Sequence, residues 1–105
     1  MNKLEKGFYS NFKYNPSVDQ YKYLYYVAPY EGGYSEDADT LMMVYIRLYG
    51  TPKIWFRRES MVFDDVSARP ENVTGQPTRF IKITDPELCT KLKERFYEMY
   101  PDLLP

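Results

Sequence analysis

The sequence lacks histidine entirely and has a single cysteine, Cys89, among its 105 residues. Without histidine the chain has no Ser-His-Asp triad, no Cys-His pair and almost none of the usual zinc sites. A lone cysteine makes no internal disulfide, which favours a reducing compartment. We therefore expect no cofactor, no metal and no catalysis based on histidine or cysteine.

Long apolar runs and a strong net charge are also missing. No run approaches the roughly 18 apolar residues that a membrane span needs, and an apolar signal-peptide core does not follow Met1. The formal charge is −1, so no global field draws the chain to nucleic acid or to a membrane. These features predict a cytoplasmic protein that folds as a single domain over residues 1–105.

Aromatic residues are abundant: 18% of the chain, with twelve Tyr, six Phe and one Trp. Tyrosine suits half-buried strands, because its ring packs while its hydroxyl meets water. Strand-forming runs occupy residues 7–14, 21–30, 41–49, 53–58 and 79–83, and a Pro- and Gly-containing loop occupies 67–78. We predict an α+β, mostly β fold with a β-rich body over 7–83. It would be a small, strongly twisted antiparallel sheet or an SH3-like partial barrel.

The C-terminal segment changes to helical periodicity. The run Thr84-Asp85-Pro86-Glu87 has the T-x-x-E form of a capping box, with a proline in the first turn. An apolar stripe then recurs at helical spacing through Leu88, Leu92, Phe96 and Met99. This pattern predicts one helix over 85–99, packed on a face of the sheet.

Residues 41–63 form the centre of the predicted sheet, as a hairpin around the breaker Gly50-Thr51-Pro52. A three-residue loop would place Leu48 opposite Ile54 and Ile46 opposite Phe56. The same register would place Arg47 opposite Trp55 and Tyr45 opposite Arg57. We therefore predict a core face made of Met42, Val44, Ile46 and Leu48, with Ile54 and Phe56 across from it.

The opposite face carries the candidate site, which we call the aromatic–arginine face: Tyr45, Arg47, Tyr49, Trp55 and Arg57. These side chains would either pack under the helix or against Tyr23 and Tyr25, or bind a partner. Tyr, Trp and Arg are frequent in protein contacts, and rings with arginines also suit single-stranded nucleic acid. The negative net charge counts against nucleic acid. The leading hypothesis is a non-enzymatic binding or interaction domain with a protein or peptide partner, and a homodimer is a further alternative.

Two acidic features are relevant to an enzyme function and to cation binding. A small enzyme or enzyme-accessory domain would need a cleft lined by Arg57, Glu59 and a tyrosine. The acidic cluster of Glu36, Asp37 and Asp39 does not have the spacing of a calcium loop, so we interpret it as a solvated loop.

An ordered set of short motifs resembles a family of small, mostly bacterial proteins known as domain of unknown function 1653. The resemblance spans residues 7–83, and the motifs are Tyr45-x-x-Leu48-Tyr49-Gly50, Trp55-x-Arg57, Met61-x-Phe63-x-x-Val66, Gly75 and Arg79-Phe80. Asn11 stands where relatives often have histidine, and Arg58 stands where they have proline. The resemblance implies a compact β-rich fold and a bacterial origin, but no activity.

Overall fold

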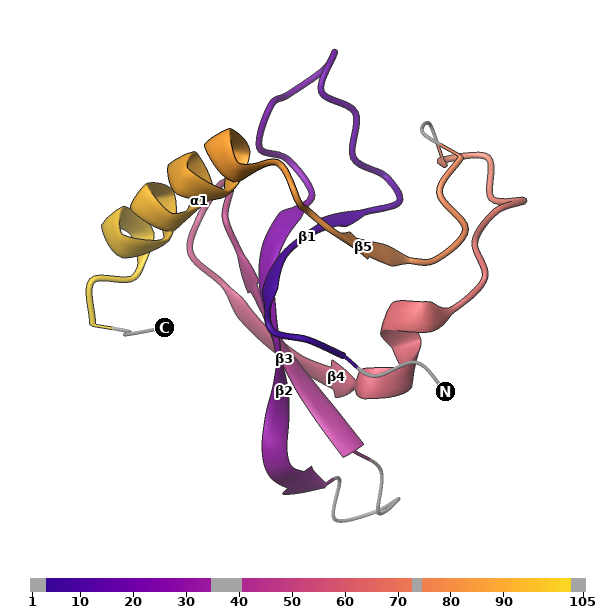
Figure 1. Ribbon diagram of the computed structural model, residues 1–105, viewed down its shortest axis with the longest axis horizontal. Helices are drawn as coiled ribbons and strands as arrows, with labels where there is room; N and C mark the ends of the chain where they lie inside the picture. Colours follow the sequence, from indigo (N-terminus) through magenta and orange to yellow (C-terminus); the bar gives the residue numbers. More distant parts are fainter. Residues whose placement is uncertain (1–3, 35–40, 73–74, 103–105) are drawn as a thin grey trace.

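The computed structural model describes residues 4–34, 41–72 and 75–102, and it has the predicted α+β, mostly β fold (Figure 1). The acidic cluster lies outside the described residues. The elements are β1 (Gly7–Asn11), β2 (Leu24–Tyr34), β3 (Leu41–Arg47), β4 (Ile54–Arg58), the 3-10 helix η1 (Glu59–Phe63), β5 (Phe80–Lys82) and α1 (Pro86–Met99).

The five strands form one antiparallel sheet in the order β4-β3-β2-β1-β5. The first strand therefore lies between the second and the fifth, which brings the end of the β-rich body back to its beginning. The helix η1 contacts both β3 and β5 and lies across the sheet from α1 (Figure 1). The sequence patterns did not predict this helix.

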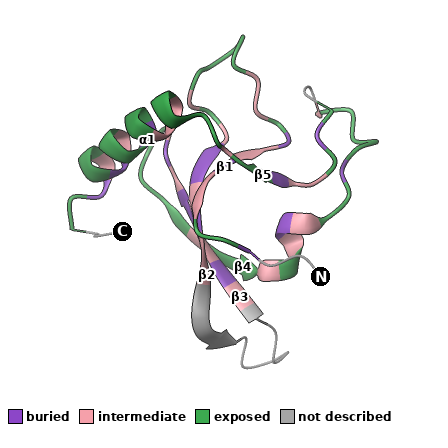
Figure 2. Ribbon diagram, viewed as in Figure 1, coloured by how far each residue is buried: buried purple, intermediate pink, exposed green. Residues whose placement is uncertain are grey.

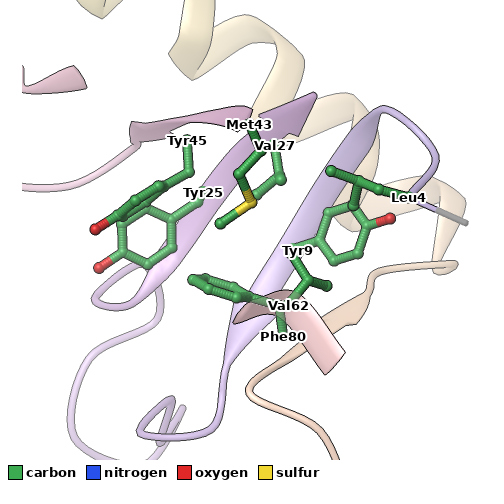
Figure 3. Packing of buried hydrophobic residues seen from close by; sticks show 8 residues of the cluster. All are labelled: Leu4, Tyr9, Tyr25, Val27, Met43, Tyr45, Val62 and Phe80. Atoms are coloured by element: carbon green, nitrogen blue, oxygen red, sulfur yellow. The ribbon is translucent and has the colours of Figure 1, made fainter. Parts of the chain in front are cut away.

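Both faces of the sheet are buried near its centre, because successive side chains of a strand point to opposite faces. One cluster lies on the face of the sheet that η1 covers, and it is shown in Figure 3. It consists of Leu4, Tyr9, Tyr25, Val27, Met43, Tyr45, Val62 and Phe80. The other lies under α1 and consists of Leu24, Ile46, Leu48, Leu92, Phe96 and Tyr100. The sheet is thus a middle layer between α1 and η1.

The C-terminal helix matches the prediction in extent, but its cap is different. Asp85, and not Thr84, is the N-cap residue, and its side chain accepts a hydrogen bond from the backbone N–H of Glu87 at 3.2 Å. Leu92 and Phe96 of the predicted stripe are buried against the sheet. After the helix, the Tyr100 hydroxyl donates to the carbonyl of Arg47 at 2.6 Å, which ties the helix end to the hairpin.

The predicted hairpin register is wrong by two residues. Ile46 pairs with Ile54 and Val44 pairs with Phe56, so the strands are joined by residues 48–53 and not by a three-residue loop. Leu48 leaves the strand and is buried under α1, while the Arg47 Nε donates to the Thr51 carbonyl at 2.8 Å inside the turn. A shift of two residues keeps each side chain on its predicted face.

The predicted core face is only half correct. Ile46 and Leu48 are buried, but Met42 and Val44 are half-buried. Ile54 and Phe56 keep 40% and 59% of their surface exposed. The physical reason is that α1 packs over the central strands, whereas β4 is an edge strand and is exposed along most of its length (Figure 2).

Candidate functional site

The structure brings the five predicted site residues together on the face of the hairpin that is turned away from α1. Tyr45 on β3 lies directly opposite Trp55 on β4. Their rings stack with centroids 5.0 Å apart and planes 12° apart. Arg47 and Tyr49 follow Tyr45 along the chain, and Arg57 follows Trp55 on β4. The strand register therefore brings residues from both strands of one hairpin, and from the start of its turn, together in the aromatic–arginine face.

Positive charges lie over these rings. The Arg47 guanidinium carbon is 5.3 Å from the ring centroid of Tyr49 and 5.6 Å from that of Trp55. The Lys53 Nζ is 5.2 Å from the Trp55 ring, and the Arg57 guanidinium is 5.8 Å from the Tyr45 ring. The predicted pairs Arg47–Trp55 and Arg57–Tyr45 thus exist, but as diagonal neighbours and not as directly opposed residues. Each such contact contributes about 0.5–1 kcal/mol at an exposed site.

The five residues differ in exposure. Tyr45 keeps only 6% of its surface exposed and belongs to the core beside Val62 and Phe80. Tyr49, Trp55 and Arg47 are half-buried, and Arg57 is exposed. None of the rings lies beneath α1, because the helix covers the other face of the sheet. The aromatic–arginine face therefore has a buried base, Tyr45, and a solvent-accessible rim.

Tyr25, which the sequence offered only as a packing partner, stands at the centre of the aromatic cluster. Its hydroxyl lies 2.8 Å from the hydroxyl of Tyr49. Burial raises the pKa of Tyr25 far above its ordinary value, and the hydrogen bond with Tyr49 raises it further. Burial also raises the pKa of Tyr45, although the positive charge of Arg57 opposes the rise. Both hydroxyls therefore stay protonated to a higher pH than the ordinary tyrosine value of 10.0.

A cavity of about 170 Å³ lies beside the aromatic–arginine face, and the sequence did not predict it. Its cationic lining comes from Lys13 after β1, Arg57 on β4 and Arg79 before β5. The rest of the lining is Asn11, Phe12, Tyr23, Tyr25, Tyr45, Met61 and Phe80. Only the sheet order could reveal this site, because it brings β1 and β5 next to each other although their residues are far apart in sequence.

The cavity has part of what the enzyme hypothesis requires. Arg57 and tyrosines line it, but Glu59 does not. One carboxylate oxygen of Glu59 is buried without a hydrogen-bond partner among the described residues. Within the same residues, no group of three or more His, Cys, Asp or Glu side chains is placed to hold a metal ion.

The ion pairs of the described residues leave the aromatic–arginine face without a carboxylate. They join Arg79 to Asp64, Lys82 to Glu5 and Lys91 to Glu87, so Arg47, Lys53 and Arg57 form none within 4 Å in the part of the chain that the structure describes. Across those residues, too, no helix has the length and apolar character needed to cross a membrane.

Comparisons with protein-family models, with curated proteins and with solved structures gave no match. The resemblance to domain of unknown function 1653 therefore stays a prediction from the motifs.

Proposed function

We propose that this protein is a small non-enzymatic binding domain whose aromatic–arginine face binds an acidic segment of a protein or peptide. The observation that carries the proposal is the set of cations over half-buried rings, with no ion-pair carboxylate among the described residues. Aromatic residues and arginine are also the side chains that contribute most binding energy in protein contacts. An acidic partner would supply the missing negative charge.

Nucleic acid is the less favoured partner. The Trp55 ring already stacks on Tyr45 and has Arg47 and Lys53 over it, so a base would have to displace these contacts in order to stack on the ring. The chain also carries a formal charge of −1, which gives no long-range attraction to phosphates.

A homodimer is a further candidate, because β4 is an edge strand of the sheet and could pair with a second copy of the chain. Measuring the mass of the protein in solution would reveal a dimer. The proposal includes a cytoplasmic location, supported by the single cysteine, and a bacterial origin, supported by the motif resemblance.

A peptide titration followed through Trp55, the only tryptophan, tests the proposal. We expect a saturable fluorescence change with peptides rich in Glu and Asp, and none with Lys-rich peptides of the same length. A double variant, Arg47→Gln with Lys53→Gln, should weaken the acidic peptide about tenfold or more, since hydrogen bonds to charged groups contribute about 1.5–3 kcal/mol each. Arg58→Gln removes the same charge from β4 on the other face and should bind as the wild type does. Equal responses to acidic and basic peptides would refute the proposal.

A small enzyme or enzyme-accessory domain remains the second candidate, because the cavity combines Arg57 with tyrosine hydroxyls. It is less well supported, since the carboxylate that the hypothesis assigned to the cleft, Glu59, does not line the cavity.

A further inference from the structure

We infer that the cavity beside the aromatic–arginine face is a binding site for a phosphate group, either free phosphate or the phosphate ester of a small molecule. The inference goes beyond the proposed function and does not depend on it, because two of the three cationic side chains of the cavity, Lys13 and Arg79, lie outside the aromatic–arginine face. It rests on the charge, the hydrogen-bond donors and the packed walls of the cavity.

The charge of the cavity matches a dianion. Three cationic side chains line it and no carboxylate does. Asp64 lies 3.5 Å from the Arg79 Nε and neutralises one of the three charges. The remaining two positive charges match a phosphate monoester, which carries about −1.5 to −2 at pH 7. A carboxylate would neutralise only one of them.

The two guanidinium groups of the cavity have neutral or distant partners among the described residues: Arg57 interacts with the Tyr45 hydroxyl and with Met61, and Arg79 with Asp64. The Arg57 Nη1 donates to the thioether sulfur of Met61 at 3.1 Å, and a thioether is a weak acceptor. The Arg79 Nε is buried and makes no hydrogen bond with the described residues, and the Asp64 carboxylate oxygen near it is 3.5 Å away. A phosphate oxygen at hydrogen-bond distance would be a stronger partner for either group, because charge-assisted hydrogen bonds are about twice as strong as neutral ones.

The tyrosine hydroxyls complete the donor set. Tyr25 and Tyr45 come from neighbouring strands, and Figure 3 shows their rings side by side with both hydroxyls pointing the same way. Both side chains line the cavity. Tyrosine hydroxyls are protonated at neutral pH, so they can add neutral donors to the cations, and Tyr25 can do so when the Tyr49 hydroxyl donates to it. A cavity of about 170 Å³ is more than ten times the roughly 10–15 Å³ that one water requires, so it has room for a phosphate.

Packing contacts help to position the walls of the cavity. The buried ring of Phe12 has the Lys13 Nζ at 5.8 Å and the Arg79 guanidinium at 5.5 Å from its centroid, which positions two of the cations. Tyr23 has a φ of 73°, the only positive φ of a non-glycine among the described residues. Such a conformation costs about 1–3 kcal/mol, and residues of this kind cluster at active sites and ligand clamps. Here it belongs to a residue that lines the cavity and packs on Tyr49.

Calorimetric titration with inorganic phosphate and with phenyl phosphate, at an ionic strength fixed with NaCl, tests the inference. We expect saturable binding that weakens about tenfold or more in Lys13→Gln and in Arg57→Gln, because each variant removes one charge-assisted contact. Lys53→Gln and Arg58→Gln remove the same charges outside the cavity and should change binding less than twofold. Lys13→Met repeats the charge loss with a side chain that still covers Phe12, and thermal unfolding verifies that each variant is folded.

The two ligands separate the two sources of the phosphate. Tighter binding of phenyl phosphate assigns the site to an ester, and equal or weaker binding assigns it to free phosphate; both outcomes support the inference. The absence of saturable binding, or equal weakening in the Lys53 and Arg58 variants, would overturn it. Loss of phosphate binding in Lys13→Gln with acidic-peptide binding retained would show that the cavity and the aromatic–arginine face act separately.

Discussion

Among single residues, Tyr25 does most to unite the core and the candidate site. Its ring makes edge contacts with those of Tyr45, Tyr49, Trp55 and Phe80, at centroid distances of 5.4, 5.7, 6.2 and 5.7 Å. Edge-to-face pairs of this kind contribute about 0.5–1.5 kcal/mol beyond their buried area. The high aromatic content of the chain therefore serves first to build a core. The aromatic–arginine face lies on the rim of that core.

The buried tyrosines predict a loss of stability at alkaline pH. Burial raises the pKa of Tyr9, Tyr25 and Tyr45 above the ordinary value of 10.0. Above pH 10 the unfolded chain releases protons that the folded chain retains, so the free energy of unfolding falls as pH rises. Each tyrosine that stays protonated adds about 1.4 kcal/mol per pH unit to the slope. Urea unfolding at a series of pH values up to about 12 measures this slope.

Substitution separates Tyr25 from the other tyrosines. Tyr25→Phe cannot ionise, so its stability should fall less steeply above pH 10 than that of the wild type. Tyr97→Phe removes the hydroxyl of a residue that is 42% exposed and serves as the matched control variant. Identical slopes for Tyr25→Phe and the wild type would contradict the burial of the Tyr25 hydroxyl.

Among the secondary-structure elements, α1 covers the β3 side of the hairpin and leaves most of β4 exposed. Ile46 and Ile54 are cross-strand partners on the same face, yet 6% of Ile46 and 40% of Ile54 is exposed. We expect Ile46→Ala to cost about 2–5 kcal/mol, as buried isoleucines do, and Ile54→Ala less than half of that. Urea unfolding of the two variants measures the difference. Equal losses would mean that α1 covers β4 as well.

The sequence predicted the elements better than their pairing. The alternation of residues 41–49 and the stripe from Leu88 to Met99 were sufficient to predict a strand and a helix. Both faces of β3 are apolar, however, so periodicity could not tell which parts of each face would be buried. The length of the turn depends on Leu48 leaving the strand to pack under α1, which is a tertiary effect. The predicted register was therefore wrong by two residues, while each side chain was assigned to the correct face of its strand.

At the scale of the whole molecule, the two faces of the sheet differ in what lies on them. One face carries α1 and is stabilised by Leu92 and Phe96 (Figure 1). The other carries the aromatic–arginine face and the cavity. The five predicted site residues were found together because they belong to one hairpin. Lys13 and Arg79 could not be predicted, because only the pairing of β1 with β5 brings them to the same cavity. Local sequence patterns contain no signal for that juxtaposition.

The central claim is that Trp55 belongs to an accessible, positively charged face and not to a sealed core. Quenching of Trp55 fluorescence by iodide and by caesium, at equal ionic strength, tests it most directly. Arg47 and Lys53 lie 5.6 and 5.2 Å from the Trp55 ring, so iodide should quench several-fold more strongly than caesium. The ratio of iodide quenching to caesium quenching should fall in the Arg47→Gln, Lys53→Gln double variant. Protection of Trp55 from both ions, or stronger quenching by caesium, would contradict the claim.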